Sequence, residues 1–333
     1  MIAVDILLSI AFFSQVGIGA QGNFFLIYIF SFLFFTGQNL RPIDLIIIQL
    51  ALTNSLVLLS KGFLQGLAAL GVKNLLDDIS CKIVFYIHRV AWGLSLSITC
   101  LLSGFQAIII SPHQPRWIKL KTRVPRYILP SILFFWLFHM LQNIMILQKL
   151  QRSSDKRNNS GTIEYGHCSV NVTTDSGISS PAIVFFIPDA MGITFISFTC
   201  SYKLYLLHKH HKRIQQVHTN NFFHRAFPET RATQMILLLV STFVTFYLLS
   251  SFLSIYMYSV TPSPYVVHSN NLLTSCFPMV SPFMLIHSDS QILRYYSAVR
   301  GRKSLQTEID SRNTLSLIYS QPLIKEKKVP GRP

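Results

Sequence analysis

Residues 81–112 read CKIVFYIHRVAWGLSLSITCLLSGFQAIIISP. After its cysteine, this stretch is apolar and long enough to cross a hydrocarbon core of about 30 Å as one helix. It also carries the ionisable pair His88 and Arg89 in its first half. A charged side chain inside lipid costs several kcal/mol unless it faces a partner or a cavity. We therefore expect this helix to line a functional cavity.

The composition of the whole chain indicates a membrane protein. Of its 333 residues, 50% are hydrophobic and 13% are charged, whereas about 25% of the residues in soluble domains are charged. The net charge of +16 comes from Lys and Arg that cluster beside apolar runs. We attribute this charge to membrane topology and expect no nucleic-acid partner.

Seven apolar runs follow one another, and we interpret each as a membrane-spanning helix. The fold class is therefore predicted to be an all-α membrane protein, a seven-helix bundle over residues 1–288. A basic tail over residues 289–333 is expected to be disordered. The predicted spans are about 2–35, 43–70, 82–111, 127–147, 181–207, 232–259 and 265–286.

Three features within the spans and loops lead to local predictions. The basic connection over residues 113–126 holds two prolines and is not expected to be buried. Pro188 is expected to interrupt the fifth span, and Lys61 either extends to the outer face or enters the central cavity. The first span offers small residues for close packing and an amide for bonding to other helices, namely Gly17, Gly19, Gly22 and Asn23.

The distribution of basic residues predicts the orientation, because cytoplasmic loops carry an excess of Lys and Arg. With a cytoplasmic C-terminus, the inside receives the larger set and the N-terminus is extracellular. Basic residues assigned to the inside are Arg41, Arg116, Lys119, Lys121, Arg123, Arg126, Lys209, Lys212, Arg213 and Arg225. Those assigned to the outside are Lys73, Lys149, Arg152, Lys156 and Arg157.

The outer loop over residues 148–180 carries two glycosylation acceptor patterns, at Asn158 and Asn171. This loop also holds Cys168, while Cys81 lies at the outer end of the third span. The other three cysteines, Cys100, Cys200 and Cys276, lie within spans. In an oxidising compartment we expect a disulfide between Cys81 and Cys168, and the alternative is two free thiols.

Several stretches resemble the vomeronasal type-1 receptors, a family of G-protein-coupled receptors. In the third span they are Cys81–Val90, Gly93–Ser97, Thr99–Ser103, Phe105–Ile108 and Ile110–Pro112. Elsewhere they are Leu58–Gly62, Pro228–Gln234 and Phe277–Phe283. The resemblance reaches from the first span through the seventh and leaves out only the tail. It implies a multi-pass chemosensory receptor of the cell membrane for a pheromone-like small molecule, with an inhibitory-type heterotrimeric G protein as partner.

The sequence departs from the expected patterns at a few positions. Trp92 stands where the family usually has arginine, and Gly104 stands where valine is usual. Compared with rhodopsin-like receptors more broadly, Gln106 takes the place of the acidic-arginine-tyrosine motif. Asn54 takes the place of the usual aspartate in the second span. The substitution at Trp92 affects ligand choice or packing, and none of these changes threatens the fold.

Ligand contacts are predicted on the outer half of the third span. Phe85, His88, Arg89 and Trp92 recur at helical spacing and offer aromatic surface, an imidazole and a cation. These groups suit a small apolar ligand with one acceptor or anionic group. The alternative is interhelical bonding, with Arg89 held by Asp189 and Trp92 in packing. Further polar contacts are predicted from Tyr256, Asn270 and Asn271.

The cytoplasmic surface of the bundle is predicted to receive the G protein. The residues predicted to face it are Gln106, Glu229, Thr230 and Arg231. For the basic residues nearby, the simpler explanation is topology and contact with anionic membrane lipids.

A transporter or channel would show repeated halves or broken helices, and a membrane enzyme would show a catalytic cluster. A bitter-taste-type receptor is the nearest alternative within the class. We expect no enzyme activity, cofactor or metal site, including at the histidine-rich segment 208–213.

Overall fold

A computed structural model describes residues 2–37, 41–71, 78–112, 114–152, 162–165, 168–171, 180–216, 227–259 and 264–288. The chain divides into two units, Met1–Ser288 and Asp289–Pro333. Every described residue lies in the first unit. The prediction of a disordered tail therefore concerns residues outside the described part of the chain.

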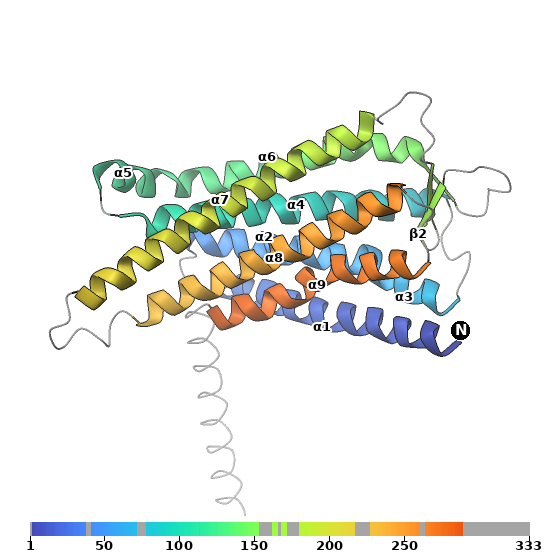
Figure 1. Cartoon of the computed structure of the whole chain (residues 1–333), viewed down its shortest axis with the longest axis horizontal. Coiled ribbons are helices and arrows are strands. Elements are labelled where there is room, and N and C mark those ends of the chain that lie inside the picture. Colours follow the sequence, from blue (N-terminus) through green and yellow to red (C-terminus); the bar gives the residue numbers. More distant parts are fainter. Residues whose placement is uncertain are drawn as a thin grey trace, which may run out of the picture. The chain divides into compact units, whose positions relative to one another are not determined.

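The described part of the chain is mostly helical, and its helices lie side by side along the length of the first unit (Figure 1). A π-helical turn, η1 (Leu58–Gly62), joins α2 to α3. The α-helices are α1 (Ile2–Phe35), α2 (Pro42–Val57), α3 (Phe63–Ala69), α4 (Asp78–Ile110), α5 (Pro115–Arg123), α6 (Pro125–Lys149), α7 (Ser180–Gln216), α8 (Phe227–Ser259) and α9 (Pro264–Ser288).

Six of the seven predicted spans form helices that are long and apolar enough to cross a membrane within the described residues. The seventh predicted span forms α9, which is not among the six. This helix carries polar side chains that the bundle buries, including Asn270, Asn271 and Ser281. A polar residue facing the interior of a bundle lowers the mean hydropathy of its helix without exposing polar atoms to lipid.

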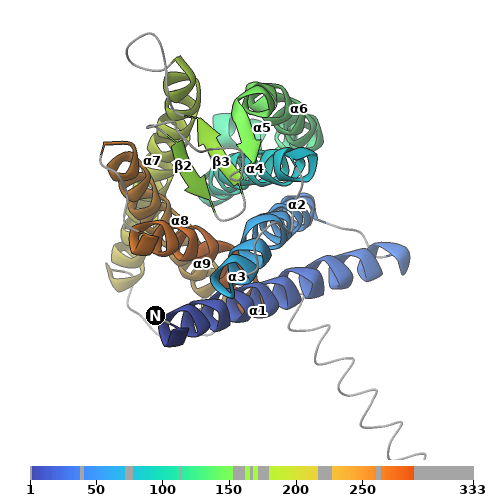
Figure 2. The same cartoon turned by 90° about the vertical axis from the view of Figure 1, so that its right-hand side faces the viewer.

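Helix α4 occupies the middle of the bundle, since it packs against α2, α6 and α7. Its residues Leu94, Ile98 and Leu102 are fully buried. They recur every four residues, so they form one apolar stripe along the helix. Helix α9 packs against α1 and α8, and Figure 2 shows α4 between α6 and α2.

Close packing of α1 depends on two of its three glycines. An added Cβ at Gly19 would lie 2.9 Å from the Cα atom of Met279, and one at Gly22 would lie 2.8 Å from Pro282. Asn23 donates a hydrogen bond of 2.9 Å to the carbonyl of Pro278. The prediction of a small packing face with a bonding amide is confirmed for these residues. For Gly17 it is wrong, because nothing lies within 4 Å of the site of its Cβ.

The expectation of a wholly helical fold needs one correction. Strands β1 (Leu150–Arg152), β2 (Thr162–Tyr165) and β3 (Cys168–Asn171) form an antiparallel sheet in the order β1-β3-β2. The strands lie across the end of the bundle where the N-terminus lies (Figure 2). Short strands in a polar loop carry little hydrophobic periodicity, and this loop forms a sheet because its strands bond with one another.

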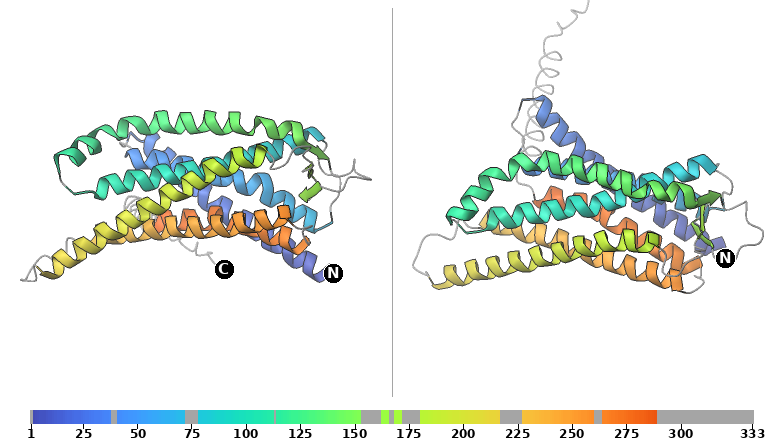
Figure 3. Two further views of the ribbon diagram at one scale, coloured as in Figure 1. Left: turned by 45° about the horizontal axis from the view of Figure 1, so that its top comes forward. Right: turned by 90° about the horizontal axis from the view of Figure 1, so that it is seen from above.

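Two further predictions, for Pro188 and for residues 113–126, can be compared with the structure. Helix α7 continues through Pro188 without a break, so the predicted interruption is wrong. The segment 113–126 contributes α5, which has no buried residue, as expected. Figure 3 shows α5 at the end of the bundle opposite the strands. The two ends are called the strand end and the α5 end below.

Candidate functional site

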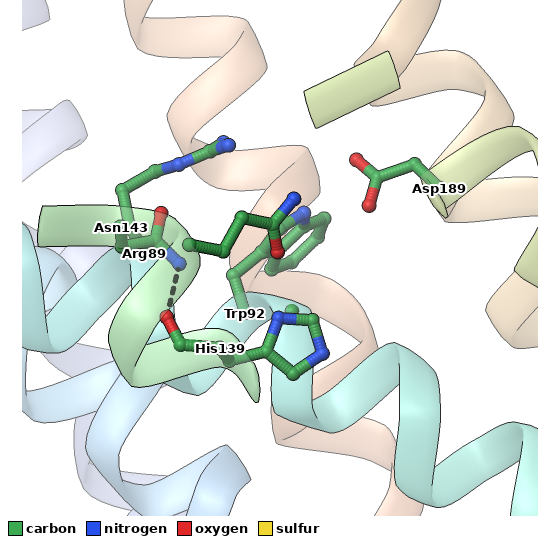
Figure 4. Close-up of a pocket in the computed structure, with 7 residues that line it drawn as sticks. Arg89, Trp92, His139, Asn143 and Asp189 are labelled. Atoms are coloured by element: carbon green, nitrogen blue, oxygen red, sulfur yellow. Dashed lines mark hydrogen bonds between the residues drawn. The ribbon is translucent and has the colours of Figure 1, made fainter. Parts of the chain in front are cut away.

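A small pocket lies between α4, α6 and α7 in the half of the bundle nearer the strand end. Its lining residues are Arg89, Trp92 and Gly93 from α4, His139, Gln142 and Asn143 from α6, and Asp189 from α7. Figure 4 shows Arg89 and Asp189 on opposite sides of the pocket, with Trp92 between them. The cavity is about 10 Å³, which is room for about one water molecule.

An aromatic stack forms the wall of this pocket toward α8. The rings of Trp92 and Tyr247 lie parallel within 15°, with centroids 5.4 Å apart. Tyr247 is buried, and its hydroxyl lies close to the carboxylate of Asp189. Asp189 lies in the electrostatic field of Arg89. The stack and the carboxylate together connect α4, α7 and α8 at one point.

The α6 side of the pocket is built around His139. Its Nε2 lies 2.8 Å from the hydroxyl of Ser97, and its backbone carbonyl accepts a hydrogen bond of 2.8 Å from Asn143. The imidazole packs so closely on Gly93 that a Cβ there would collide with the ring. The Oδ1 atom of Asn143 is buried and has no hydrogen-bond partner among the described residues. A buried acceptor without a partner costs about 1–3 kcal/mol unless a water or ligand satisfies it.

A second group of basic residues lies beside Arg89. Lys61 belongs to the π-helical turn η1, and both Lys61 and Arg89 lie close enough to interact electrostatically with His88. The Nδ1 atom of His88 lies 3.4 Å from the hydroxyl of Ser60. Single π-turns within helices occur frequently at functional sites. Of the two alternatives for Lys61, the structure favours the interior of the bundle.

The structure divides the predicted ligand-contact residues among several environments. Arg89, Trp92 and Asp189 line the same pocket, whereas His88 faces Ser60 of η1. Adjacent side chains on an α-helix point about 100° apart, so His88 and Arg89 can reach different neighbours. The half-buried side chain of Phe85 is not part of the pocket lining.

The predicted contacts from the last two helices lie away from this pocket. Asn270 is bonded to Ser250 at 3.0 Å and to Ser254 at 3.3 Å, both on α8. Asn271 is buried, and neither polar atom of its side chain has a partner among the described residues. Tyr256 is 45% exposed. None of the three is among the residues that line the pocket.

Sequence reasoning missed His139, Gln142, Asn143 and Tyr247. A signal existed for two of them, since His139 and Asn143 lie four residues apart in an apolar span. Side chains at this spacing share a helix face, and polar groups within a span mark functional or bonding sites. Tyr247 carried no such signal, because an aromatic residue within a span is ordinary core.

The remaining predicted sites are only partly described. Cys81 is fully buried and disulfide-bonded, and Cys100, Cys200 and Cys276 are free. Asn158 lies outside the described residues, as do the side chains of Cys168, Asn171, Glu229, Thr230 and Arg231. Gln106 is buried between α4 and α7. Within the described part, no three His, Cys, Asp or Glu side chains form a group that could hold a metal ion.

The fold defines the class of protein. The chain superimposes on squid rhodopsin with a TM-score of 0.67, covering 99% of this chain and 93% of that structure at 18% sequence identity. At this identity the likeness shows the fold alone, which is that of the G-protein-coupled receptors. The predicted helical receptor fold is therefore confirmed, apart from the corrections given above.

The family follows from the sequence comparisons. Residues 6–298 match the vomeronasal organ pheromone receptor family. The chain is 42% identical over 297 residues to human vomeronasal type-1 receptor 1, covering 89% of this chain and 84% of that protein. It is 39% identical to human vomeronasal type-1 receptor 3, covering 91% of this chain and 97% of that protein. It is 28% identical to the zebrafish olfactory receptor class A-like protein 1, covering 92% of this chain and 96% of that protein.

The chain thus belongs to the vomeronasal type-1 receptor family, and the predicted resemblance is confirmed. It is a chemosensory G-protein-coupled receptor, a multi-pass protein of the cell membrane and not an enzyme. The family implies a small-molecule ligand and a G protein as partners.

Proposed function

We propose that this receptor binds a pheromone-like small molecule in the pocket between α4, α6 and α7 and then activates an inhibitory-type G protein. The observation that carries the proposal is the placement of Arg89 and Asp189 on either side of the Trp92 indole. A cation, a carboxylate and an aromatic face converge there from different helices. Such convergence of a few polar groups on an apolar wall is typical of small-molecule sites.

The charges around the pocket indicate the chemistry of the ligand. Lys61 and Arg89 are basic and lie close enough to interact electrostatically, and Asp189 is the acidic residue that lines the pocket. The excess of basic groups favours a ligand with an acceptor or anionic group, which Arg89 is placed to bind. The stacked rings of Trp92 and Tyr247 suit an apolar body. Trp92 is thus proposed to serve both packing and ligand choice.

Binding requires the helices around the pocket to separate. The present cavity admits about one water molecule, whereas small-molecule pockets enclose about 300–1,000 Å³. A ligand that fits only the opened arrangement shifts the equilibrium toward that arrangement. We propose that this opening is the activating change, because α4 and α7 continue from the pocket to the α5 end.

The α5 end is proposed to be cytoplasmic, and the N-terminus extracellular. Arg116, Lys119, Lys121 and Arg123 lie on α5, and Arg126 begins α6. This concentration of basic residues supports the orientation through the positive-inside rule. Gln106, Glu229, Thr230 and Arg231 would then be near the G protein. The predicted disulfide and glycosylation sites would lie at the extracellular strand end.

The disulfide between Cys81 and Cys168 is part of this proposal. Backbone pairing places Cys168 opposite Arg152 of β1, and β1 packs against α4. Cys81 lies in the first turn of α4. The bond would fix the sheet over the strand end of the bundle and so shape the ligand entrance.

The test is inhibition of cAMP production in cells that display the chain, challenged with a panel of volatile and steroid-like compounds. Surface delivery is measured for every variant by an epitope tag. For any activating compound, Arg89→Gln is expected to weaken potency about 10- to 100-fold, as for loss of a charge-assisted hydrogen bond. Lys209→Gln removes the same charge from an exposed site on α7 and is the matched control. Equal potency in the parent and Arg89→Gln would place the ligand elsewhere.

A further inference from the structure

Lys203 is a buried cation far from the pocket. Its side chain on α7 is 2% exposed. Its Nζ atom donates hydrogen bonds of 3.0 Å to Ser103 Oγ and 3.3 Å to Gln106 Oε1, both on α4. Within the described residues no carboxylate forms an ion pair with it. The Cys200 thiol lies close enough to interact with this ammonium group. Burying an ammonium group among neutral groups is costly, because their dipoles replace hydration incompletely.

The cluster around Lys203 has more donors than acceptors. An ammonium group carries three N–H donors, and the described partners use two of them. The Gln106 residue is only 5% exposed, and no described residue accepts a hydrogen bond from its buried Nε2 atom. The hydroxyl of Ser103 already lies 2.7 Å from that of Thr199. A buried polar group without a protein partner can bond to a water or an ion.

The unpaired donors lie close to one another. Gln106 Nε2 belongs to the same amide whose Oε1 accepts from Lys203, so this N–H group and the ammonium are near neighbours. One oxygen anion can accept hydrogen bonds from both. A hydrogen bond to a charged acceptor is stronger than one to a neutral acceptor. The negative charge of the anion would also offset the positive charge of the buried ammonium group.

The site lies toward the α5 end of the bundle. Gln106 is about one turn before the end of α4 at Ile110, and Lys203 is about two turns before the end of the α7 span at Lys209. An anion would reach it from this end when α4 and α7 part. We propose that Lys203 and Gln106 form a binding site for one carboxylate between α4 and α7. The carboxylate comes from a dissolved acid or from a polypeptide that enters this end of the bundle.

The first experiment measures thermal unfolding of the purified full chain in lipid nanodiscs while sodium acetate replaces sodium isethionate at constant ionic strength. Acetate is expected to raise the Tm of the parent with saturation, as for a ligand that binds only the folded state. Lys203→Gln is expected to weaken acetate binding at least about tenfold. Lys209→Gln, an exposed lysine on the same helix, is expected to respond like the parent.

A second variant keeps the test decisive if Lys203→Gln does not fold. Gln106→Glu places a carboxylate next to Lys203 with almost no change of shape. This variant is expected to have a higher Tm than the parent without acetate and to respond no further when acetate is added. The proposal is overturned if the parent shows no saturable response, or if the parent and Gln106→Glu respond alike.

Two peptides distinguish the sources of the carboxylate. The C-terminal segment of an inhibitory-type G-protein α subunit is tested with a free C-terminal carboxylate and as its C-terminal amide. If the peptide with the free carboxylate raises the Tm and its amide does not, and Lys203→Gln abolishes this effect, the site binds a polypeptide chain end. Stabilisation by acetate alone assigns it to a dissolved acid. Neither readout needs a pheromone-like ligand, so this proposal and the proposed function fail separately.

Discussion

The Nδ2 atom of Asn54 donates a hydrogen bond of 2.8 Å to the hydroxyl of Ser281, which lies 227 residues later in the chain. The Oδ1 atom of Asn54 accepts one of 3.0 Å from Ser95. All three residues are buried, and they come from α2, α9 and α4. An aspartate at position 54 would only accept hydrogen bonds when ionised, whereas the amide both donates and accepts. The neutral side chain therefore joins three helices without a buried charge.

Replacing this amide is expected to destabilise the bundle. Asn54→Leu leaves the hydroxyls of Ser95 and Ser281 buried without this partner, at about 1–3 kcal/mol for each unsatisfied group. Thermal unfolding of the purified receptor is expected at a Tm lower by several degrees. Thr242→Val, which removes an exposed hydroxyl bonded to its own helix, serves as control. An equal Tm for Asn54→Leu and the parent would show that these bonds add nothing to stability.

Two glycines on α1 are expected to respond in opposite ways to alanine. Gly19→Ala places a Cβ against Leu58 and the backbone of Met279, so α1 must move away from α9, at about 1–3 kcal/mol. Gly17→Ala meets nothing within 4 Å and removes a flexible residue from a helix, which stabilises by about 0.5–1 kcal/mol. Tm values of the two variants measure the difference. A lower Tm for Gly17→Ala than for Gly19→Ala would contradict the packing described above.

The two interactions of Tyr247 can be separated. Tyr247→Phe keeps the stack on Trp92 and loses the hydroxyl beside Asp189, whereas Tyr247→Leu loses both. An aromatic pair contributes about 0.5–1.5 kcal/mol beyond buried area. Tyr247→Leu is therefore expected to show the lower Tm. If Tyr247→Phe loses as much stability as Tyr247→Leu, the contact of the hydroxyl with Asp189 of α7, and not the stack on Trp92 of α4, accounts for the contribution of Tyr247.

Loss of the proposed disulfide is expected to destabilise the receptor by about 2–5 kcal/mol. Cys81→Ser, Cys168→Ser and the double variant are expected to unfold at similar temperatures, because one bond is lost in each. Cys276→Ala removes a free thiol and should leave the Tm within a few degrees of the parent. Mass spectrometry of the unreduced protein checks the pairing directly. A double variant with an additive loss of stability would argue against a shared bond.

Glycosylation tests the proposed orientation. With the segment between α6 and α7 outside, Asn158 and Asn171 face the lumen during synthesis and become acceptors. Removal of N-glycans is expected to lower the apparent mass of the parent in gel electrophoresis. Asn158→Gln and Asn171→Gln should each lower it by one glycan, and the double variant should be insensitive to deglycosylation. A parent of unchanged mass would remove this support for an extracellular N-terminus.

Most of the architecture could be predicted from the sequence, because membrane helices are long and must satisfy their backbone hydrogen bonds within themselves. Six of the seven predicted spans therefore coincide with described helices long and apolar enough to cross a membrane, and the seventh forms α9. The sheet of β1, β2 and β3 was missed, because each strand is short and its pairing with the other strands cannot be seen in its own sequence. The break at Pro188 was predicted from local propensity, yet α7 continues through this residue. Neighbouring helices can satisfy the carbonyl that a proline leaves unbonded.

The sequence by itself determined the receptor fold, the family and the presence of a cation in the third span, since these depend on composition, spacing and local motifs. Only the tertiary structure decided that Arg89 shares a pocket with His139 and Asp189, while the adjacent His88 faces Ser60. The rotation of each helix about its axis sets these contacts. That rotation results from side-chain packing between residues far apart in the chain, such as Gly93 with His139 and Trp92 with Tyr247.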